Sequence, residues 1–192
     1  MHTDLGPVLA LYPMPTTIVG AHCGGKPNFL AVAHLSPMNH GHPQYVAIGL
    51  NKLHHTNAGI LENGQFSINI PGQDLLVKTD YVGIVSGKNT DKSRLFDLFY
   101  GQLPAAPLVR DCPVCMECRL HQHFVLGVHD IFVGELVATH ADPAVLTDGK
   151  IDFGKVKPML FEMPRKKYWA LGPELGDCWS AGKALKNKET KL

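Results

Sequence analysis

The stretch TTIVGAHCGGKPNFLAVAHLS, residues 16–36, joins two apolar, partly β-branched runs through a glycine-rich turn. Residues 16–22 and 28–36 each have the composition of a strand. Between them, Gly24-Gly25 followed by Lys26-Pro27 is typical of a tight hairpin turn. The stretch therefore predicts a β-hairpin near the start of the chain.

The same pattern of strands and turns continues through the rest of the chain. Further strands are predicted at residues 44–50 and 65–71, in two long runs at 114–127 and 130–141, and in PMLFEM and YWALG after an Asp148-Gly149 turn. Helices are predicted after Thr56, as an N-cap, up to Gly64, over residues 73–87, and at KSRLFDLF after Asp91. Short strands with few helices predict an all-β fold, a closed or partly closed barrel.

The composition is that of an ordinary globular protein, with 45% apolar and 18% charged residues among 192. The net charge of +1 gives no electrostatic basis for binding nucleic acid or an anionic membrane. No apolar run approaches the length of a bilayer, and the start lacks the basic region of a signal peptide. We therefore expect a cytoplasmic protein whose five cysteines are mostly reduced thiols.

Three cysteines lie close together in DCPVCMECRL, residues 111–120. A period of two from Val114 onward predicts a half-buried strand with Cys115 and Cys118 on opposite faces, roughly 10 Å apart at about 3.3 Å per residue. Zinc needs each sulfur within about 2.3 Å, so one extended strand cannot offer both to one ion. We interpret the cysteines as packed or incidental thiols. Whether Cys112 and Cys115 form a reversible disulfide at the preceding turn stays open.

Histidines on the same strand allow a second interpretation. His121 and His123 are two residues apart and face the same side, as ligands of a metal can. With His129 recruited, they would make the chain a metal-binding β-barrel without flavin. A solvated strand face is the interpretation that we favour.

The chain resembles the flavin reductase-like, FMN-binding split-barrel family, and most closely its flavoredoxin branch. The segments that carry the resemblance occur in order over nearly the whole chain: YPMPTTIVGA, GKPNFLAVAHLSP, AIGLNKLHHTNAGILENGQFSINIP, GIVSGKNTDK, DCPVCMECRL, HDIFVGEL and YWALGPELGDCWSAGK. The resemblance implies a single domain over residues 1–192, with residues 184–192 as a flexible tail. It also implies a homodimeric Greek-key barrel with FMN at the subunit interface.

The phosphate of FMN favours helix N-terminal amides, a hydroxyl and a cation, and NKLHHT supplies Lys52, His54, His55 and Thr56. By resemblance, further phosphate or ribityl contacts fall in SGKNTDK, on Lys92, Ser86 and Lys88.

The resemblance places the flavin ring beside NFLA, residues 28–31, and His34 stands where relatives often have tryptophan. His129 lies in GVHD, where relatives have GDH, and Phe161 and the Tyr168-Trp169 pair match aromatic residues near the ring. The cofactor-binding residues that we predict are Asn28, Phe29, Leu30, Ala31, His34, Leu50, Asn51, Lys52, His55, Thr56, Ser86, Lys88, Lys92, His129, Phe161 and Trp169.

The function implied is that of an FMN-dependent oxidoreductase of the flavin reductase type, with NAD(P)H as the electron donor. The alternative is a flavoredoxin-like electron carrier that is reduced by a redox protein partner. No Gly-x-Gly-x-x-Gly motif is present, so a separate dinucleotide-binding domain is not expected. Because FMN itself carries the hydride, we assign no catalytic residue.

Overall fold

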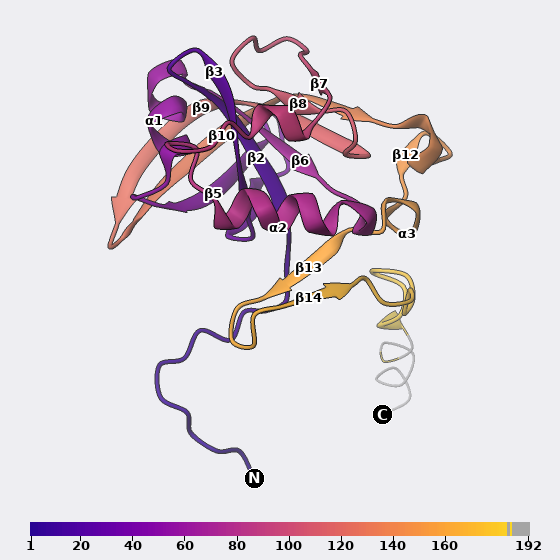
Figure 1. The fold of residues 1–192 in the computed structure, drawn as a ribbon. Helices are drawn as coiled ribbons and strands as arrows, with labels where there is room; N and C mark the ends of the chain where they lie inside the picture. Colours follow the sequence, from indigo (N-terminus) through magenta and orange to yellow (C-terminus); the bar gives the residue numbers. More distant parts are fainter. Residues whose placement is uncertain (184, 186–192) are drawn as a thin grey trace.

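The computed structural model describes residues 1–183 and residue 185, so the predicted tail at 184–192 lies, apart from Leu185, outside the described residues. Seven strands form one antiparallel sheet in the order β3-β2-β6-β9-β10-β5-β4 (Figure 1). These strands are β2 (Thr17–Cys23), β3 (Lys26–Val32), β4 (Leu35–Asn39), β5 (Tyr45–Asn51), β6 (Gln65–Ile70), β9 (Val114–Leu126) and β10 (His129–Ala141).

The sheet closes into a barrel at the link between β3 and β4. These strands are consecutive in the chain yet lie at opposite edges of the sheet, and only Ala33 and His34 separate them. The two edges must therefore come together. The link itself already contacts β5, because the amide of Gly49 donates to the carbonyl of His34 at 2.8 Å. The single strand predicted over residues 28–36 is wrong, because it is interrupted at Ala33 and His34 and its last two residues, Leu35 and Ser36, pair with β5.

Two predicted turns are confirmed. Gly24 and Gly25, between β2 and β3, have φ angles of 56° and 76°, which glycine adopts without a Cβ penalty. Asp148 and Gly149, with φ of 51° and 73°, join β11 (Leu146–Thr147) to β12 (Lys150–Ile151).

Cys115 and Cys118 lie on opposite faces of β9, as the alternation predicts. Cys118 joins the core inside the barrel, whereas Cys115 packs with a second cluster outside it. The outer face is not solvated there, because β7 (Leu98–Phe99), β8 (Leu108–Val109) and the segment between them cover it. The strands pack on Cys115, and Leu103 of the intervening segment donates to the buried Glu117. The barrel core consists of Val19, Ala21, Leu30, Val32, Ile48, Leu50, Ile60, Phe66, Ile68, Cys118 and Phe132.

Helix α1 (His55–Asn63) ends at Gly64, as expected, where φ is 63°. The prediction that Thr56 is its N-cap is wrong. His54 occupies that position without a side-chain cap, and Thr56 lies inside the first turn. There the Thr56 hydroxyl accepts a hydrogen bond of 2.9 Å from Asn28, so it contacts β3 instead of capping the helix.

The predicted helix over residues 73–87 is a 3-10 turn (Gln73–Leu75) followed by α2 (Leu76–Ile84). The helix predicted at KSRLFDLF is wrong, since only a 3-10 turn (Ser93–Leu95) forms before β7. Phe96 leaves helical geometry and packs edge-on against Phe29 at 5.3 Å between ring centroids. Tertiary packing therefore overrides the local helical pattern.

A smaller sheet of β1 (Met14–Pro15), β13 (Met159–Glu162) and β14 (Lys167–Ala170) lies near α2 and outside the barrel (Figure 1). A hydrogen bond of 2.9 Å from the Tyr168 hydroxyl to Asp80 ties β14 to α2. The remaining short elements are a 3-10 turn (Pro143–Val145) and α3 (Phe153–Val156). Within the described residues, no helix combines the length and apolar character that a membrane span needs.

Helix α1 packs so closely on β2 that Gly59 has no room for a side chain. A Cβ at Gly59 would collide with the carbonyl of His22 and with Cys23 Sγ at 2.5 Å. We expect Gly59→Ala to lower the free energy of unfolding by about 1–3 kcal/mol, because a backbone atom cannot move aside cheaply. Urea unfolding measures this as a lower midpoint with an unchanged slope.

The matched control is Gly172→Ala, where no heavy atom lies within 4 Å of the added methyl group. A Gly59→Ala midpoint equal to that of the control would show that α1 and β2 can separate without cost.

Candidate functional site

Three adjoining pockets follow β3 on the outside of the barrel. The first, the α1 pocket, has a volume of about 170 Å³. The second, the imidazole pocket, has about 400 Å³ and shares His54 with the first. The third, the tyrosine pocket, has about 260 Å³ and shares Phe161 with the second and Gly83 with the first. The shared walls place the three pockets next to one another along β3, and together they are called the cleft.

The α1 pocket is the polar end of the cleft. Its wall holds the Asn28–Thr56 hydrogen bond, and Lys92 reaches it from the chain after α2. The Lys92 Nζ donates to the carbonyls of Phe29 and Val82, both at 2.8 Å, and the side chain is only 2% exposed. Burial lowers the pKa of Lys92 to about 8, and its ammonium has a third N–H to offer.

Gly87 lets the loop after α2 approach this pocket closely. A Cβ at Gly87 would collide with the Asn28 amide oxygen and lie 3.1 Å from the His55 ring. Ser86 lies beside it on the same loop and lines the pocket with His55. Backbone, hydroxyl and cation therefore meet in a small space, which is the donor set that a phosphate group requires.

The imidazole pocket is named for His34, in the link between β3 and β4, for His54, just before α1, and for His129, at the start of β10. The His34 Nε2 and the Tyr12 hydroxyl are 3.1 Å apart, and the rings of His34 and His129 lie 5.8 Å apart. Burial and His129 lower the pKa of His34. Burial, Lys92 and His129 lower the pKa of His54. The other lining residues are apolar or neutral: Ala31, Val32, Ala33, Gly49, Leu50, Asn51, Phe161 and Met163.

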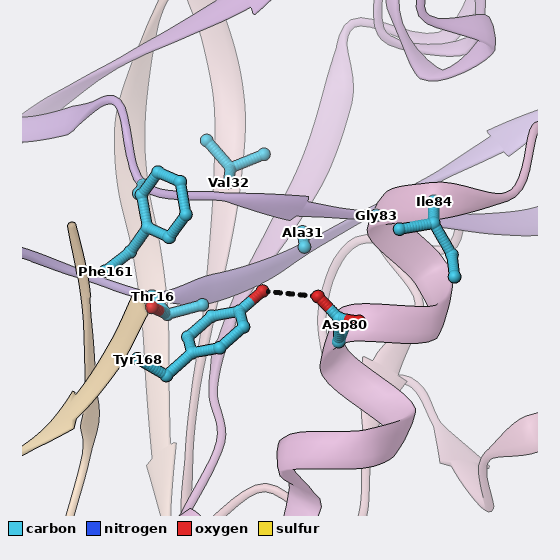
Figure 2. A pocket seen from close by; sticks show the side chains of 9 residues that line it. Thr16, Ala31, Val32, Asp80, Gly83, Ile84, Phe161 and Tyr168 are labelled. Atoms are coloured by element: carbon cyan, nitrogen blue, oxygen red, sulfur yellow. Dashed lines mark hydrogen bonds between the residues drawn. The ribbon is translucent and has the colours of Figure 1, made fainter. Parts of the chain in front are cut away.

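The tyrosine pocket has two neighbouring aromatic side chains, Phe161 and Tyr168, on one side and α2 on the other. Figure 2 shows the Tyr168 hydroxyl directed at Asp80 on α2, with Phe161 beside Tyr168. Burial and the neighbouring Asp80 raise the pKa of Tyr168 to about 12, so the hydroxyl stays protonated as a donor. Gly83 brings α2 close to β3, since a Cβ there would lie 3.2 Å from that of Ala31.

The cleft brings most of the predicted cofactor-binding residues together. Twelve of them line its pockets: Asn28, Leu30, Ala31, His34, Leu50, Asn51, His55, Thr56, Ser86, Lys92, His129 and Phe161. Their binding role stays a prediction, but their convergence from β3, β5, α1, β10 and β13 is a property of the fold.

Four predicted residues lie elsewhere. The Phe29 ring points into the packed cluster against Phe96, and only its backbone faces Lys92. Lys52 and Lys88 are exposed and are not among the lining residues. Trp169 is 46% exposed and donates to Glu162 at 2.7 Å.

Sequence reasoning missed several lining residues, chiefly Asp80 and Gly83, and from the aromatic pair that it placed near the ring it chose Trp169 as a binding residue and not Tyr168. Tyr168 and Trp169 are neighbours on β14, so they point to opposite sides, and Tyr168 is the one that faces the cleft. The Tyr168-Trp169 pair was the available signal, but the sequence does not tell which member faces inward. Nothing in the sequence of α2 marks Asp80 as the partner.

The three histidines of the metal alternative have separate partners. His121 packs on Tyr45 at 4.6 Å, His123 bonds Asp130 at 3.0 Å, and His129 faces His34. A bulge in the β9–β10 pairing falls at His121. Among the described residues, no group of three or more His, Cys, Asp or Glu side chains is arranged to hold a metal ion.

The two neighbouring thiols at the start of β9 are free in this structure. Cys115 donates to the carbonyls of Val109 at 3.3 Å and Cys112 at 3.6 Å. Burial raises the pKa of Cys115 to about 12 and also raises the pKa of Cys112. Because the thiolate is the reactive form, both are poor nucleophiles at neutral pH.

A seven-stranded split barrel with a cleft along its edge strand places the chain among flavin reductase-like proteins. Residues 9–166 match the family model of the flavin reductase like domain, and the chain belongs to that family. The prediction of family and fold is thereby confirmed.

Solved structures agree with this assignment. Flavoredoxin from Methanosarcina acetivorans is 39% identical, with a TM-score of 0.93, over 96% of this chain and 99% of that one. Flavoredoxin of Desulfovibrio vulgaris (Miyazaki F) is 33% identical, with a TM-score of 0.88, over 95% and 100%. An FMN-binding protein from Thermus thermophilus shares the fold at 20% identity, with a TM-score of 0.78, over 93% and 99%.

Proposed function

We propose that the chain binds FMN in the cleft along β3 and acts as an FMN-dependent oxidoreductase that takes electrons from NAD(P)H. The observation that carries the proposal is the polarity of the cleft. One end holds a buried lysine, a hydroxyl and a helix N-terminus, and the other is a wide pocket with apolar and imidazole walls. FMN has the same polarity, with a dianionic phosphate at one end and a flat ring at the other.

The residues present fit the phosphate of FMN. The ammonium of Lys92 has one N–H beyond its two carbonyl bonds, and Thr56 sits in the first turn of α1, whose amides favour an anion. The close approach at Gly87 forms a cradle that a Cβ would fill. A phosphate dianion beside Lys92 would favour the charged ammonium and so offset the effect of burial on its pKa.

The wider pockets fit the ring. FMN supplies the redox chemistry when bound, and the chain's task is to orient the ring and exclude water. Phe161 and Met163 give the imidazole pocket apolar surface, and the buried Nδ1 of His54 has no hydrogen-bond partner within the described structure. An unpaired polar atom at such a wall is costly unless a ligand or water satisfies it.

The phosphate site generates a direct test. We expect Thr56→Val to weaken FMN binding roughly 10- to 150-fold, because a lost hydrogen bond to a charged group costs roughly 1.5–3 kcal/mol. Lys92→Met should weaken it by as much or more. Quenching of flavin fluorescence on binding measures the affinity.

Thr56→Ser keeps the hydroxyl and is the matched control, with affinity expected near that of the wild type. Unchanged FMN affinity in folded Thr56→Val and Lys92→Met proteins would refute the phosphate site.

We also propose a homodimer with FMN at the subunit interface. Large apolar side chains stand exposed near the cleft, at Leu53 and at the β9–β10 turn on Leu126 and Val128. Burial of this surface by a second copy would exclude water from the ring. Sedimentation of the FMN-loaded protein should give the mass of two chains, and a single-chain mass at micromolar concentration would contradict the dimer.

Reduction by nicotinamide separates the proposed enzyme from a carrier. On anaerobic mixing with NADH or NADPH, we expect the flavin absorbance to bleach rapidly, because a stacked nicotinamide can pass its hydride directly to the ring. Stopped-flow absorbance measures the rate. Free FMN at the same concentration is the control.

The second candidate function is a flavoredoxin-like electron carrier reduced by a protein partner. It is favoured by the likeness to two flavoredoxins at 39% and 33% identity over nearly the whole chain. Two results together would favour the carrier. Neither NADH nor NADPH would bleach the FMN-loaded protein faster than it bleaches free FMN, and a reduced iron–sulfur protein would reduce it.

A further inference from the structure

His34, His54 and His129 converge on the imidazole pocket from places far apart in the chain. His34 lies on the link that closes the barrel, His54 immediately precedes α1, and His129 begins β10. All three line a cavity of about 400 Å³. An imidazole can accept or release a proton near neutral pH. The cluster can therefore exchange protons, which a pocket that only holds an apolar ring does not need to do.

The carboxylates near this pocket are turned to other partners. Asp130, next to His129, accepts from Asn57 at 2.7 Å and pairs with His123. Glu162, next to Phe161, pairs with Arg165 and accepts from Trp169. Asp80 accepts from Tyr168 in the adjoining pocket. No carboxylate is among the residues that line the imidazole pocket itself.

The groups that do face the cluster are basic or neutral. Lys92 and His129 lie near His54 and disfavour a positive charge on its ring, and His129 has the same effect on His34. The other neighbour of His34 is the Tyr12 hydroxyl. With burial, these neighbours hold the pKa values of His34 and His54 below the ordinary value of 6.5, which keeps both rings neutral at neutral pH. The Nδ1 of His54 is buried without a hydrogen-bond partner in the described structure. His34 and His54 are therefore neutral imidazoles, each with one ring N–H, and no carboxylate of the pocket lining faces them.

We propose that the imidazole cluster, with His54 as its main member, takes up a proton when a ligand in the pocket gains negative charge. This inference rests on the proposed FMN function, in which two-electron reduction adds that charge. A hydride brings two electrons and one proton to the flavin, leaving it anionic. One further proton then passes from hydronium in the solvent to an imidazole nitrogen, so that an O–H bond breaks, an N–H bond forms and a water molecule is left. The resulting imidazolium neutralises the reduced ring.

The experiment measures protons instead of turnover. FMN-loaded protein is reduced photochemically in weakly buffered solution near pH 7, with a pH-indicator dye. We expect the wild type to take up one proton more per flavin than His54→Gln. We also expect the spectrum of its reduced flavin to remain that of the anion, because the extra proton is on the protein. The midpoint potential should depend on pH about half as steeply in His54→Gln.

The matched control is His22→Gln. His22 pairs with the Tyr100 hydroxyl at 2.9 Å, much as His34 pairs with Tyr12, and burial lowers its pKa too, but it lies outside the cleft. Its proton uptake should equal that of the wild type. If His54→Gln does not fold, His34→Gln serves in its place.

The outcomes separate the two proposals. Equal proton uptake in wild type and variant with FMN bound, or a reduced spectrum that shows a protonated ring, overturns the proton-accepting cluster and leaves FMN binding intact. Failure of the wild type to bind FMN overturns the proposed function, and the cluster's role falls with it.

Discussion

The barrel depends on a two-residue connection. Because β3 ends at Val32 and β4 begins at Leu35, the two edge strands of a seven-stranded sheet cannot lie farther apart than a short link allows. An open twisted sheet of this order would separate them by the width of the sheet, so closure is obligatory. The linking residues, Ala33 and His34, then line the cleft, and the seam of the barrel is where the site lies.

Buried polar contacts hold the polar end of this cleft. An ammonium removed from water is costly unless its donors are paired, and Lys92 pairs with carbonyls of β3 and α2. The same side chain thus joins two elements and presents charge to the α1 pocket. Asn28 and Thr56 link β3 to α1 in the same way. The same side chains therefore stabilise the fold and face the proposed ligand, so substitutions here must be tested for folding as well as for binding.

Local patterns predicted the local features of this fold. Turns at Gly24-Gly25 and Asp148-Gly149 follow from backbone freedom, and the separation of Cys115 from Cys118 follows from the period of a strand. The wrong predictions concern features that depend on contacts between segments far apart in the chain. Burial of Glu117 depends on the segment between β7 and β8, and the helix expected after Asp91 gives way to packing of Phe96. Family resemblance found most of the cleft-lining residues and placed the Tyr168-Trp169 pair near the ring. It gave no sign of Asp80, whose hydrogen bond with Tyr168 spans 88 positions of the chain.

The hydrogen bond between Tyr168 and Asp80 also bears on biosynthesis. The cleft draws its walls from Asn28 near the start of the chain to Tyr168 near its end. During synthesis the N-terminal strands emerge from the ribosome first, but the last wall is absent until β14 has left the exit tunnel. A cofactor that needs all of these walls is therefore bound only once β14 has emerged, and the nascent barrel must stay folded without it until then.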